Sequence, residues 1–391
     1  MGTKLMHSSP ERTLNIISRS SDSPVRCAYL LGGYVPHFLP EYAGENPQAE
    51  FQEFMQRNDT TAFDYGSLGA LRVFKFIKFL KTKHFFAMFA TKWRNQHDVS
   101  ITSGEDIGIL CALIDLLTGC DNPIVIITHG SYFGSKYWKY VAKLLRSQKH
   151  IHWACLSKSL ARTLVDDHGF SPSQVHATGY GVDINYFQPS RTLTPKPLIL
   201  AAGTANRDYL SLVSSMQGLD VDVRIAADSA WYPVQTDVDG LSIPANITVK
   251  SAGNYRGLRD LYTASTFVVV PMNHAKFACG YAVIVEAMAM GKTVISTRTD
   301  AISDFIIDGE NGFLVDVGDV DTLKKRITFL LDNPSIAERM GEKARSDIEK
   351  NWSLAAYSSR LEEAVMSAYR QTRGDIVSGY KCAQSSQSGI Q

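Results

Sequence analysis

The chain has 391 residues, 45% of them hydrophobic, and its 40 Lys and Arg residues nearly balance 39 Asp and Glu residues, giving a net charge of +1. About 100 to 200 residues per domain is typical, so this length predicts two globular domains. The near-neutral charge gives no overall field that would attract nucleic acid, so no nucleic-acid partner is expected. No apolar run approaches the roughly 20 residues that span a bilayer, and the chain opens with polar residues, so a cytoplasmic protein is expected.

The first half of the chain alternates short apolar runs with helical patterns, as in parallel sheets covered by helices. The polar residues 1–24 predict a flexible N-terminus, and PVRCAYLLGG (24–33) then predicts a buried strand ending in a glycine turn, where a ligand crevice is expected. We expect residues 25–190 to form one Rossmann-like domain. Further strands are predicted at 97–102, 123–130 and 151–157, with a helix at 106–119 that ends at Gly119.

The alternation restarts after residues 188–197, which contain two prolines and are the expected interdomain linker. Residues 198–352 predict a second Rossmann-like domain, and 353–372 predict a final helix that packs back toward the first domain. Residues 375–391 lack apolar periodicity and predict a disordered tail. The fold class is therefore α/β, with two Rossmann-like domains facing a central cleft. Strands of the second domain are predicted at 198–203, 221–227, 246–253, 265–271, 292–297 and 312–316.

One carboxylate, Glu286, stands within a mostly apolar helical stretch. If the helix begins near Gly280, the first N–H groups at Gly280, Tyr281 and Ala282 are unpaired and suit a phosphate. Glu286, one and a half turns further on, could then accept hydrogen bonds from the vicinal hydroxyls of the same ligand's sugar. The alternative is an ordinary helix-face glutamate that is solvated or ion-paired.

A long motif in the second half resembles a known family. Residues 283–323 contain E-A-M-A-x-G-K-x-V-I-x-T, D-G-E-N-G-F-L-V and G-D-V in order, with weaker matches at 156–164 and 179–189. They resemble the donor-binding region of the retaining GT-B glycosyltransferases of the glycosyltransferase group 1 superfamily. The resemblance implies a GT-B fold and transfer of a sugar from a nucleotide-diphosphate donor with retained configuration. It also implies a sugar, lipid or small-molecule acceptor, and no required metal or other cofactor.

The resemblance assigns roles to individual residues. Glu286 resembles the glutamate that binds the donor ribose, and AAGTANRD (201–208) resembles a glycine turn followed by a phosphate-binding arginine, which implies Gly203 and Arg207. His129, at the end of a predicted strand, resembles a catalytic histidine near the transferred sugar. The alternative for Arg207 is a surface arginine at a helix start.

Two family positions differ in this chain. A lysine usually follows the arginine by five or six residues, where this chain has Leu212 and Val213, and a donor-sugar glutamate usually stands where it has Ala278. The loop 272–280 looks longer than usual and supplies Asn273, His274 and Lys276. We expect His274 to contact the donor and Lys276 to replace the missing lysine, the alternative being incidental polar loop residues.

The acceptor side is expected on the first domain, from Gly32, Gly33 and Glu105. Glu105 and Asp106 follow a predicted strand, so they could touch the acceptor or cap the following helix. Residues 71–95 contain seven Lys or Arg and no acid, with an apolar stripe that includes Phe76 and a basic side that includes Lys78. Such a helix could lie peripherally on an anionic membrane surface; alternatively it is an ordinary domain helix with solvated lysines or lines a cleft for an anionic acceptor.

These patterns favour a retaining nucleotide-sugar-dependent glycosyltransferase. The alternatives are a non-catalytic GT-B binding or scaffold subunit, which Ala278 makes credible, and a GT-B sugar-nucleotide epimerase. A nicotinamide dehydrogenase is not expected, because no G-x-G-x-x-G follows the first strand of either domain.

Overall fold

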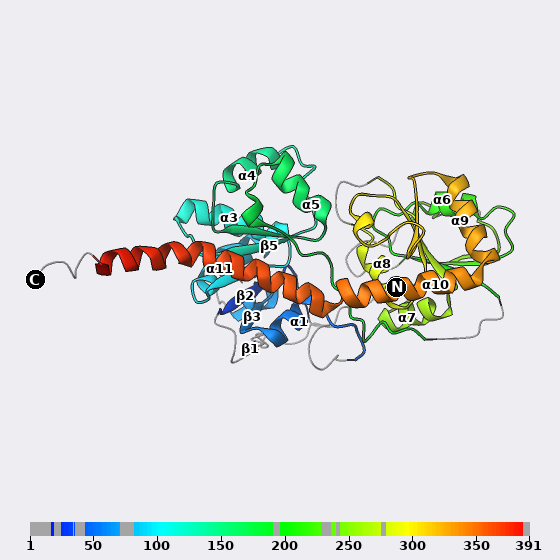
Figure 1. The fold of residues 1–391 in the computed structure, drawn as a ribbon, viewed down its shortest axis with the longest axis horizontal. Helices are drawn as coiled ribbons and strands as arrows, with labels where there is room; N and C mark the ends of the chain where they lie inside the picture. Colours follow the sequence, from blue (N-terminus) through cyan, green and yellow to red (C-terminus); the bar gives the residue numbers. More distant parts are fainter. Residues whose placement is uncertain are drawn as a thin grey trace, which may run out of the picture.

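The computed structural model describes residues 17–18, 25–33, 35, 44–70, 82–190, 196–227, 236–239, 243–274 and 279–385. They form two α/β domains, each built on its own sheet, and a long C-terminal helix that runs from one domain to the other (Figure 1). In this described part no helix is both long and apolar enough to cross a membrane. Ten strands were predicted from apolar runs, and all ten are present.

The N-terminal sheet has the strand order β1-β3-β2-β4-β5-β6-β7 and is parallel except at its edge, where β1 runs antiparallel to β3. Every residue of β2, β4, β5 and β6 is buried, which explains the continuous apolar runs of these strands. The strands are β1 Ile17–Ser18, β2 Cys27–Leu30, β3 Thr60–Phe63, β4 Val99–Thr102, β5 Ile124–Thr128, β6 Ile151–Cys155 and β7 Val175–Ala177.

Two helix ends of this domain have recognisable caps. The helix α3 ends at Gly119, whose φ of 70° is the left-handed conformation that glycine adopts readily, and the Ser157 hydroxyl accepts a 3.1 Å hydrogen bond from Leu160 N at the start of α5. The helices are α1 Glu50–Arg57, α2 Thr82–Arg94, α3 Glu105–Thr118, α4 Trp138–Leu145 and α5 Lys158–Arg162, the last continued by a π-helical turn Thr163–Asp167.

The C-terminal sheet is fully parallel, with the order β10-β9-β8-β11-β12-β13. Its central position is taken by β8 and β11, so the loops after these two strands meet at one edge of the sheet. The strands are β8 Leu198–Ala202, β9 Asp222–Ala226, β10 Ile247–Val249, β11 Phe267–Val270, β12 Val294–Thr297 and β13 Gly312–Val315. The helices are α6 Tyr209–Ser215, α7 Tyr255–Ala264, α8 Tyr281–Ala289, α9 Val320–Asp332 and α10 Pro334–Asn351.

The last helix, α11 (Leu354–Ser385), leaves the C-terminal domain and packs against α1 and β4 to β7 of the N-terminal domain (Figure 1). Arg57 of α1 binds it through Glu362, with Nη2 3.2 Å from the carboxylate. The helix continues beyond residue 372, so the disordered tail expected from 375 is wrong for residues 375–385. Extending a formed helix gains one hydrogen bond per residue, whereas only starting a helix is costly, so apolar periodicity is not needed for the extension.

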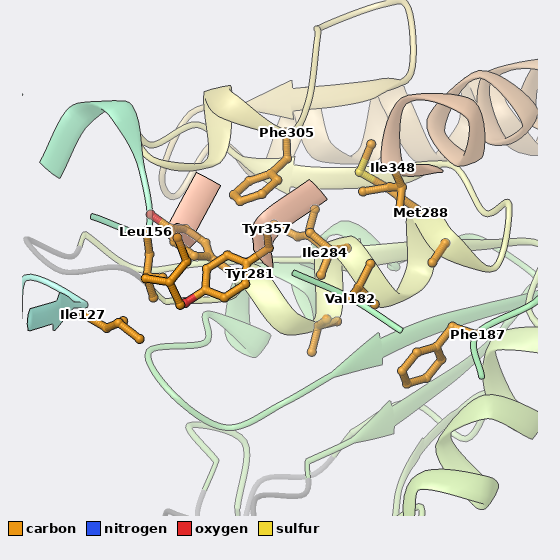
Figure 2. Packing of buried hydrophobic residues seen from close by; sticks show 14 of the residues in the cluster. Ile127, Leu156, Val182, Phe187, Tyr281, Ile284, Met288, Phe305, Ile348 and Tyr357 are labelled. Carbon is orange, nitrogen blue, oxygen red and sulfur yellow. The ribbon is translucent and has the colours of Figure 1, made fainter. Parts of the chain in front are cut away.

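One hydrophobic cluster joins the two domains. It contains residues of the N-terminal sheet, of the connecting segment and of the C-terminal helices, and Figure 2 shows them packed around α8. Because α8 contacts both domains through this cluster, its N-terminal end has a fixed place between them. The labelled members are Ile127, Leu156, Val182, Phe187, Tyr281, Ile284, Met288, Phe305, Ile348 and Tyr357.

Candidate active site

A cavity of about 550 Å³ lies between the two domains and is called the cleft below. Both domains contribute to its wall, as expected of a site at the carboxyl ends of parallel strands. The structure brings together seven of the residues predicted to be functional: Gly32, Gly33, His129, Gly280, Tyr281, Ala282 and Glu286.

The N-terminus of α8 opens onto this cleft. Gly280 is the N-cap residue, with a φ of 84°, and its lack of a side chain leaves no side-chain cap on the first turn. A Cβ atom at Gly280 would lie 3.1 Å from Met272 Sδ, so glycine allows the turn to lie against Met272, and Arg207 Nη1 stands just beyond at 3.7 Å from the same point. The first N–H groups of α8 therefore form a region of positive potential at the cleft wall.

Arg207 lies directly behind this wall and is only 7% exposed, so the alternative of a surface arginine is wrong. Its guanidinium donates to the carbonyls of Ala202 (2.9 Å) and Ala205 (2.7 Å) and contacts Met272 Sδ at 3.0 Å. Among the described residues, no carboxylate lies within ion-pair distance of it. Burial lowers the pKa of Arg207, which expresses the cost of a buried cation without an anion.

Gly203 and Asn273 hold Arg207 in this place, although neither lines the cleft. Gly203 has a φ of 90°, and a Cβ atom there would lie 2.4 Å from Arg207 Nη2, so any other residue would displace the guanidinium. The Asn273 amide donates a 2.9 Å hydrogen bond to the Arg207 carbonyl. The glycine turn predicted before the arginine therefore serves to seat the arginine.

Glu286 faces the cleft from the second turn of α8 and is 8% exposed. The Tyr262 hydroxyl donates a 2.9 Å hydrogen bond to Glu286 Oε2, and no described Lys or Arg pairs with this carboxylate. Burial, and to a smaller extent the nearby Glu50, raise the pKa of Glu286 to about 8, while the bond from Tyr262 lowers it. The solvated glutamate considered above is thus excluded, and within the described residues the ion-paired one is not found.

Glu50, the first residue of α1, is a second cleft carboxylate that was not predicted. Burial raises its pKa, and a hydrogen bond with Tyr180 of the connecting segment lowers it. The signal in the sequence was the spacing of Phe51, Phe54 and Met55, which are buried on one face of α1 and mark an amphipathic helix with acids in its first turn. Even with that helix recognised, nothing local indicates that Glu50 meets a helix of the other domain.

Glu105 does not line the cleft, so its prediction as a cleft residue is wrong. It is 4% exposed and accepts hydrogen bonds from His129 N (2.7 Å) and Ser131 N (2.6 Å). It is the first residue of α3, whose N-cap is Gly104, so it does not cap the helix either. Both carboxylate oxygens are used to hold the loop that carries His129, which stands at the carboxyl end of β5 and lines the cleft.

Several other predicted residues lie elsewhere. His274 is exposed and does not line the cleft, and Lys276 and Ala278 fall outside the described residues. Leu212, at one position where the family has its lysine, is fully buried in the core of the C-terminal domain.

The basic segment 71–95 is divided by the structure. Residues 71–81, with most of its apolar stripe and lysines, lie outside the described residues, and the rest forms α2. Arg94 is 1% exposed and makes two hydrogen bonds of 2.8 and 2.7 Å to Asp115 of α3, while Phe86 is fully buried. One face of α2 thus belongs to the domain core, while Met88 and Lys92 of the same helix are exposed. Within the described residues, no three His, Cys, Asp or Glu side chains are grouped as a metal site would require.

Comparison with known proteins gives similarities to glycosyltransferases. Residues 218–347 match the family of glycosyl transferases group 1. An uncharacterized glycosyltransferase of Methanocaldococcus jannaschii is 24% identical over 225 residues, which cover 58% of this chain and 61% of that protein. The matches span between 43% and 61% of the lengths of the first three curated relatives.

Solved structures show the fold over nearly the whole chain. A glycosyltransferase of Rickettsia africae superposes with a TM-score of 0.64 at 17% identity, covering 89% of this chain and 98% of that one. The HepE protein of Anabaena, solved with UDP-glucose, gives a TM-score of 0.64 at 12% identity, covering 88% and 100%. The chain therefore has the GT-B fold, and its resemblance to the group 1 glycosyltransferases is confirmed.

Proposed function

We propose that the protein is a glycosyltransferase that moves a sugar from a nucleotide-diphosphate donor to an acceptor with retention of configuration. The observation that carries this proposal is the buried cation of Arg207 behind the start of α8, which pairs with no carboxylate of the described residues, together with Glu286 in the adjoining cleft. A buried cation without a counter-ion is costly, and a diphosphate in the cleft would supply the missing negative charge. The relative solved with UDP-glucose has the same fold, which supports a nucleotide sugar as ligand.

The proposed roles follow from position. The N–H groups of Tyr281 and Ala282, together with Arg207, would hold the diphosphate and stabilise the negative charge that develops on the leaving oxygen. Glu286 would accept hydrogen bonds from the ribose hydroxyls. Lys276, in the loop just before Gly280, would add a second cation, since one guanidinium and a helix dipole worth about half a unit charge leave a diphosphate incompletely neutralised.

The acceptor would bind on the side of Gly32, Gly33 and His129, all of which line the cleft from the N-terminal domain. His129 would contact a hydroxyl of the transferred sugar or orient the acceptor, and Glu105 would keep its loop in place. The reaction is proposed to need no metal, because the diphosphate charge is assigned to cationic side chains and the helix terminus. The anomeric configuration of the product, read by NMR, tests retention.

The experiment that tests the function is a thermal-shift panel of UDP, GDP, ADP and TDP sugars, followed by assay of free nucleoside diphosphate. A donor at about 100 times its Kd should stabilise the folded protein by about 2.7 kcal/mol, which is enough to rank the bases. Release of nucleoside diphosphate that requires Arg207 supports the proposal. No stabilisation by any of the four bases contradicts it.

A non-catalytic binding subunit is the second candidate, because Ala278 replaces the family glutamate and Leu212 is buried where the family has a lysine. Nucleotide binding without release of nucleoside diphosphate, across a broad set of acceptors, would favour that function. An epimerase would be recognised by a changed sugar that remains attached to the nucleotide.

A further inference from the structure

The outer face of α4, together with its N-cap residue Tyr137, carries an apolar stripe. Its members follow the spacing i, i+3, i+7, which places them on one side of the helix. Large exposed apolar residues normally occur singly on a soluble domain, so three in one stripe indicate a contact surface. The stripe consists of Tyr137, Tyr140 and Leu144, which are 64%, 61% and 55% exposed, whereas Trp138, Ala142 and Leu145 form the buried inner face.

A basic stripe runs beside the apolar one. Lys136, Lys139 and Lys143 are exposed, and each directly precedes a member of the apolar stripe. Two of them fold over the neighbouring rings, with Lys136 Nζ 5.0 Å from the Tyr137 centroid and Lys139 Nζ 4.9 Å from that of Tyr140. The six residues of these two stripes are called the α4 surface below.

The surroundings of the α4 surface strengthen its positive charge. Residues 122–165 contain no Asp or Glu, and no described acid forms an ion pair with the three lysines. The basic residues in this stretch are Lys136, Lys139, Lys143, Arg146, Lys149, Lys158 and Arg162. The helix α4 lies at the outer edge of the N-terminal domain (Figure 1).

We propose that the α4 surface rests on an anionic membrane leaflet. Tyrosine rings and a leucine suit the boundary between headgroups and acyl chains, and the lysines beside them can extend their ammonium groups to anionic headgroups. A convex single helix fits a lipid surface, which adapts to it, better than a rigid protein groove. In this arrangement α4 lies on the leaflet without crossing it.

The position of α4 connects this surface to the cleft. Ser131 lines the cleft, and only a short segment separates it from Lys136. With the α4 surface on a leaflet, the acceptor side of the cleft stands close to lipid, which favours an acceptor held in the membrane. This last step rests on the proposed function, whereas membrane binding is measured without any turnover.

The test is co-sedimentation of the full chain with phosphatidylcholine vesicles that do or do not contain phosphatidylglycerol. The protein should pellet with the anionic vesicles only, and binding should fade as NaCl screens the charges. The triple variant Lys136→Gln, Lys139→Gln, Lys143→Gln should bind about a hundredfold more weakly, at about fivefold for each lysine near an anionic surface. The variant Tyr137→Ser, Tyr140→Ser, Leu144→Ser should lose most of its binding.

Matched controls remove the same charge or apolar area elsewhere. Two triple variants change exposed residues of the C-terminal domain instead, and both should bind vesicles as the wild type does. The charge control is Lys250→Gln, Lys325→Gln, Lys350→Gln, and the apolar control is Leu210→Ser, Val249→Ser, Ile307→Ser. Thermal unfolding shows that each variant is folded. The proposal would be overturned if the protein pelleted with neither kind of vesicle or equally with both. It would also be overturned if the α4 variants bound vesicles as well as their controls do. A protein that binds vesicles but releases no nucleoside diphosphate would contradict the proposed function alone.

Discussion

Tyr262 of α7 donates a 2.9 Å hydrogen bond to Glu286 of α8, so that a buried carboxyl group of the cleft is held by a neighbouring helix. The remaining surroundings of this carboxyl are unfavourable to its charge: it is 8% exposed, and Glu50 lies on the opposite side of the cleft. Burial therefore raises the pKa of Glu286 to about 8. Tyr180 and Tyr255 also line the cleft. The carboxylate of Glu50 is the main cause that raises the pKa of Tyr180, whereas burial, followed by Glu286 and Glu50, raises the pKa of Tyr255.

We first predict that nucleotide affinity rises with pH between about 7 and the Glu286 pKa of about 8. Ribose hydroxyls donate to the ionised carboxylate, so binding must expel the proton that the empty site retains. Titration calorimetry over this range, where most of the diphosphate is already fully ionised, measures the effect. The variant Glu286→Gln should bind the nucleotide more weakly, and its affinity should not rise with pH. If the affinity of both proteins changed equally with pH, another group would be responsible.

The second prediction concerns stability. Because the folded-state pKa of Glu286, about 8, lies above the ordinary glutamate value of 4.5, the folded protein binds more protons than the unfolded chain between these values. Its free energy of unfolding should therefore fall as pH rises from about 4.5 through 8. Urea unfolding at pH 6 and pH 9 should show that Glu286→Gln loses less stability than wild type. If both proteins lost the same free energy of unfolding between pH 6 and pH 9, the raised pKa would not belong to Glu286.

Third, Glu50→Gln should move the pH profile of nucleotide binding to lower pH. The substitution removes one of the two effects that raise the pKa of Glu286, so its carboxylate forms at lower pH. The control is Glu53→Gln, on the same helix but outside the cleft, which should leave the midpoint unchanged. A shift of equal size in both variants would indicate a general change of charge.

Fourth, Lys276→Met and Arg207→Met should each lower turnover by about two orders of magnitude or more in folded protein, because each removes a cation that acts most strongly in the transition state. The control Arg298→Met removes a half-exposed cation that pairs with Asp308 away from the cleft. Unchanged turnover of Lys276→Met would refute its assignment as the replacement cation and favour the non-catalytic reading.

The sequence predicted much of this fold because parallel strands covered on both faces are continuous apolar runs, as in FVVV of β11. It did not predict β3, whose TTAF has two threonines in four residues and obtains its place by pairing with β2. The helix α3 was predicted with its end at Gly119, because a left-handed C-terminal glycine is a local signal.

In the candidate site, too, features with a local sequence pattern were predicted, and features that depend on distant contacts were not. The local pattern around Gly280 and Glu286 predicted both the helix start and the carboxylate facing the cleft. The burial of Arg207 and the approach of Glu50 depend on contacts between distant segments, which no local pattern contains. Glu105 was assigned to the cleft because strand ends usually carry functional residues, but its carboxylate is fully used by backbone N–H groups.

The central claim is that the cleft holds a nucleotide with its ribose at Glu286 and its diphosphate at Arg207 and α8. The most direct measurement is a cycle of four affinities: wild type and Glu286→Gln, each with a nucleoside diphosphate and with its 2′,3′-dideoxy analogue. Two charge-assisted hydrogen bonds are worth on the order of 3 kcal/mol, so removing either the carboxylate or the hydroxyls should weaken binding about a hundredfold, and removing both should cost little more. If the two losses instead add up, Glu286 does not bind the ribose, and the proposed placement of the nucleotide is wrong.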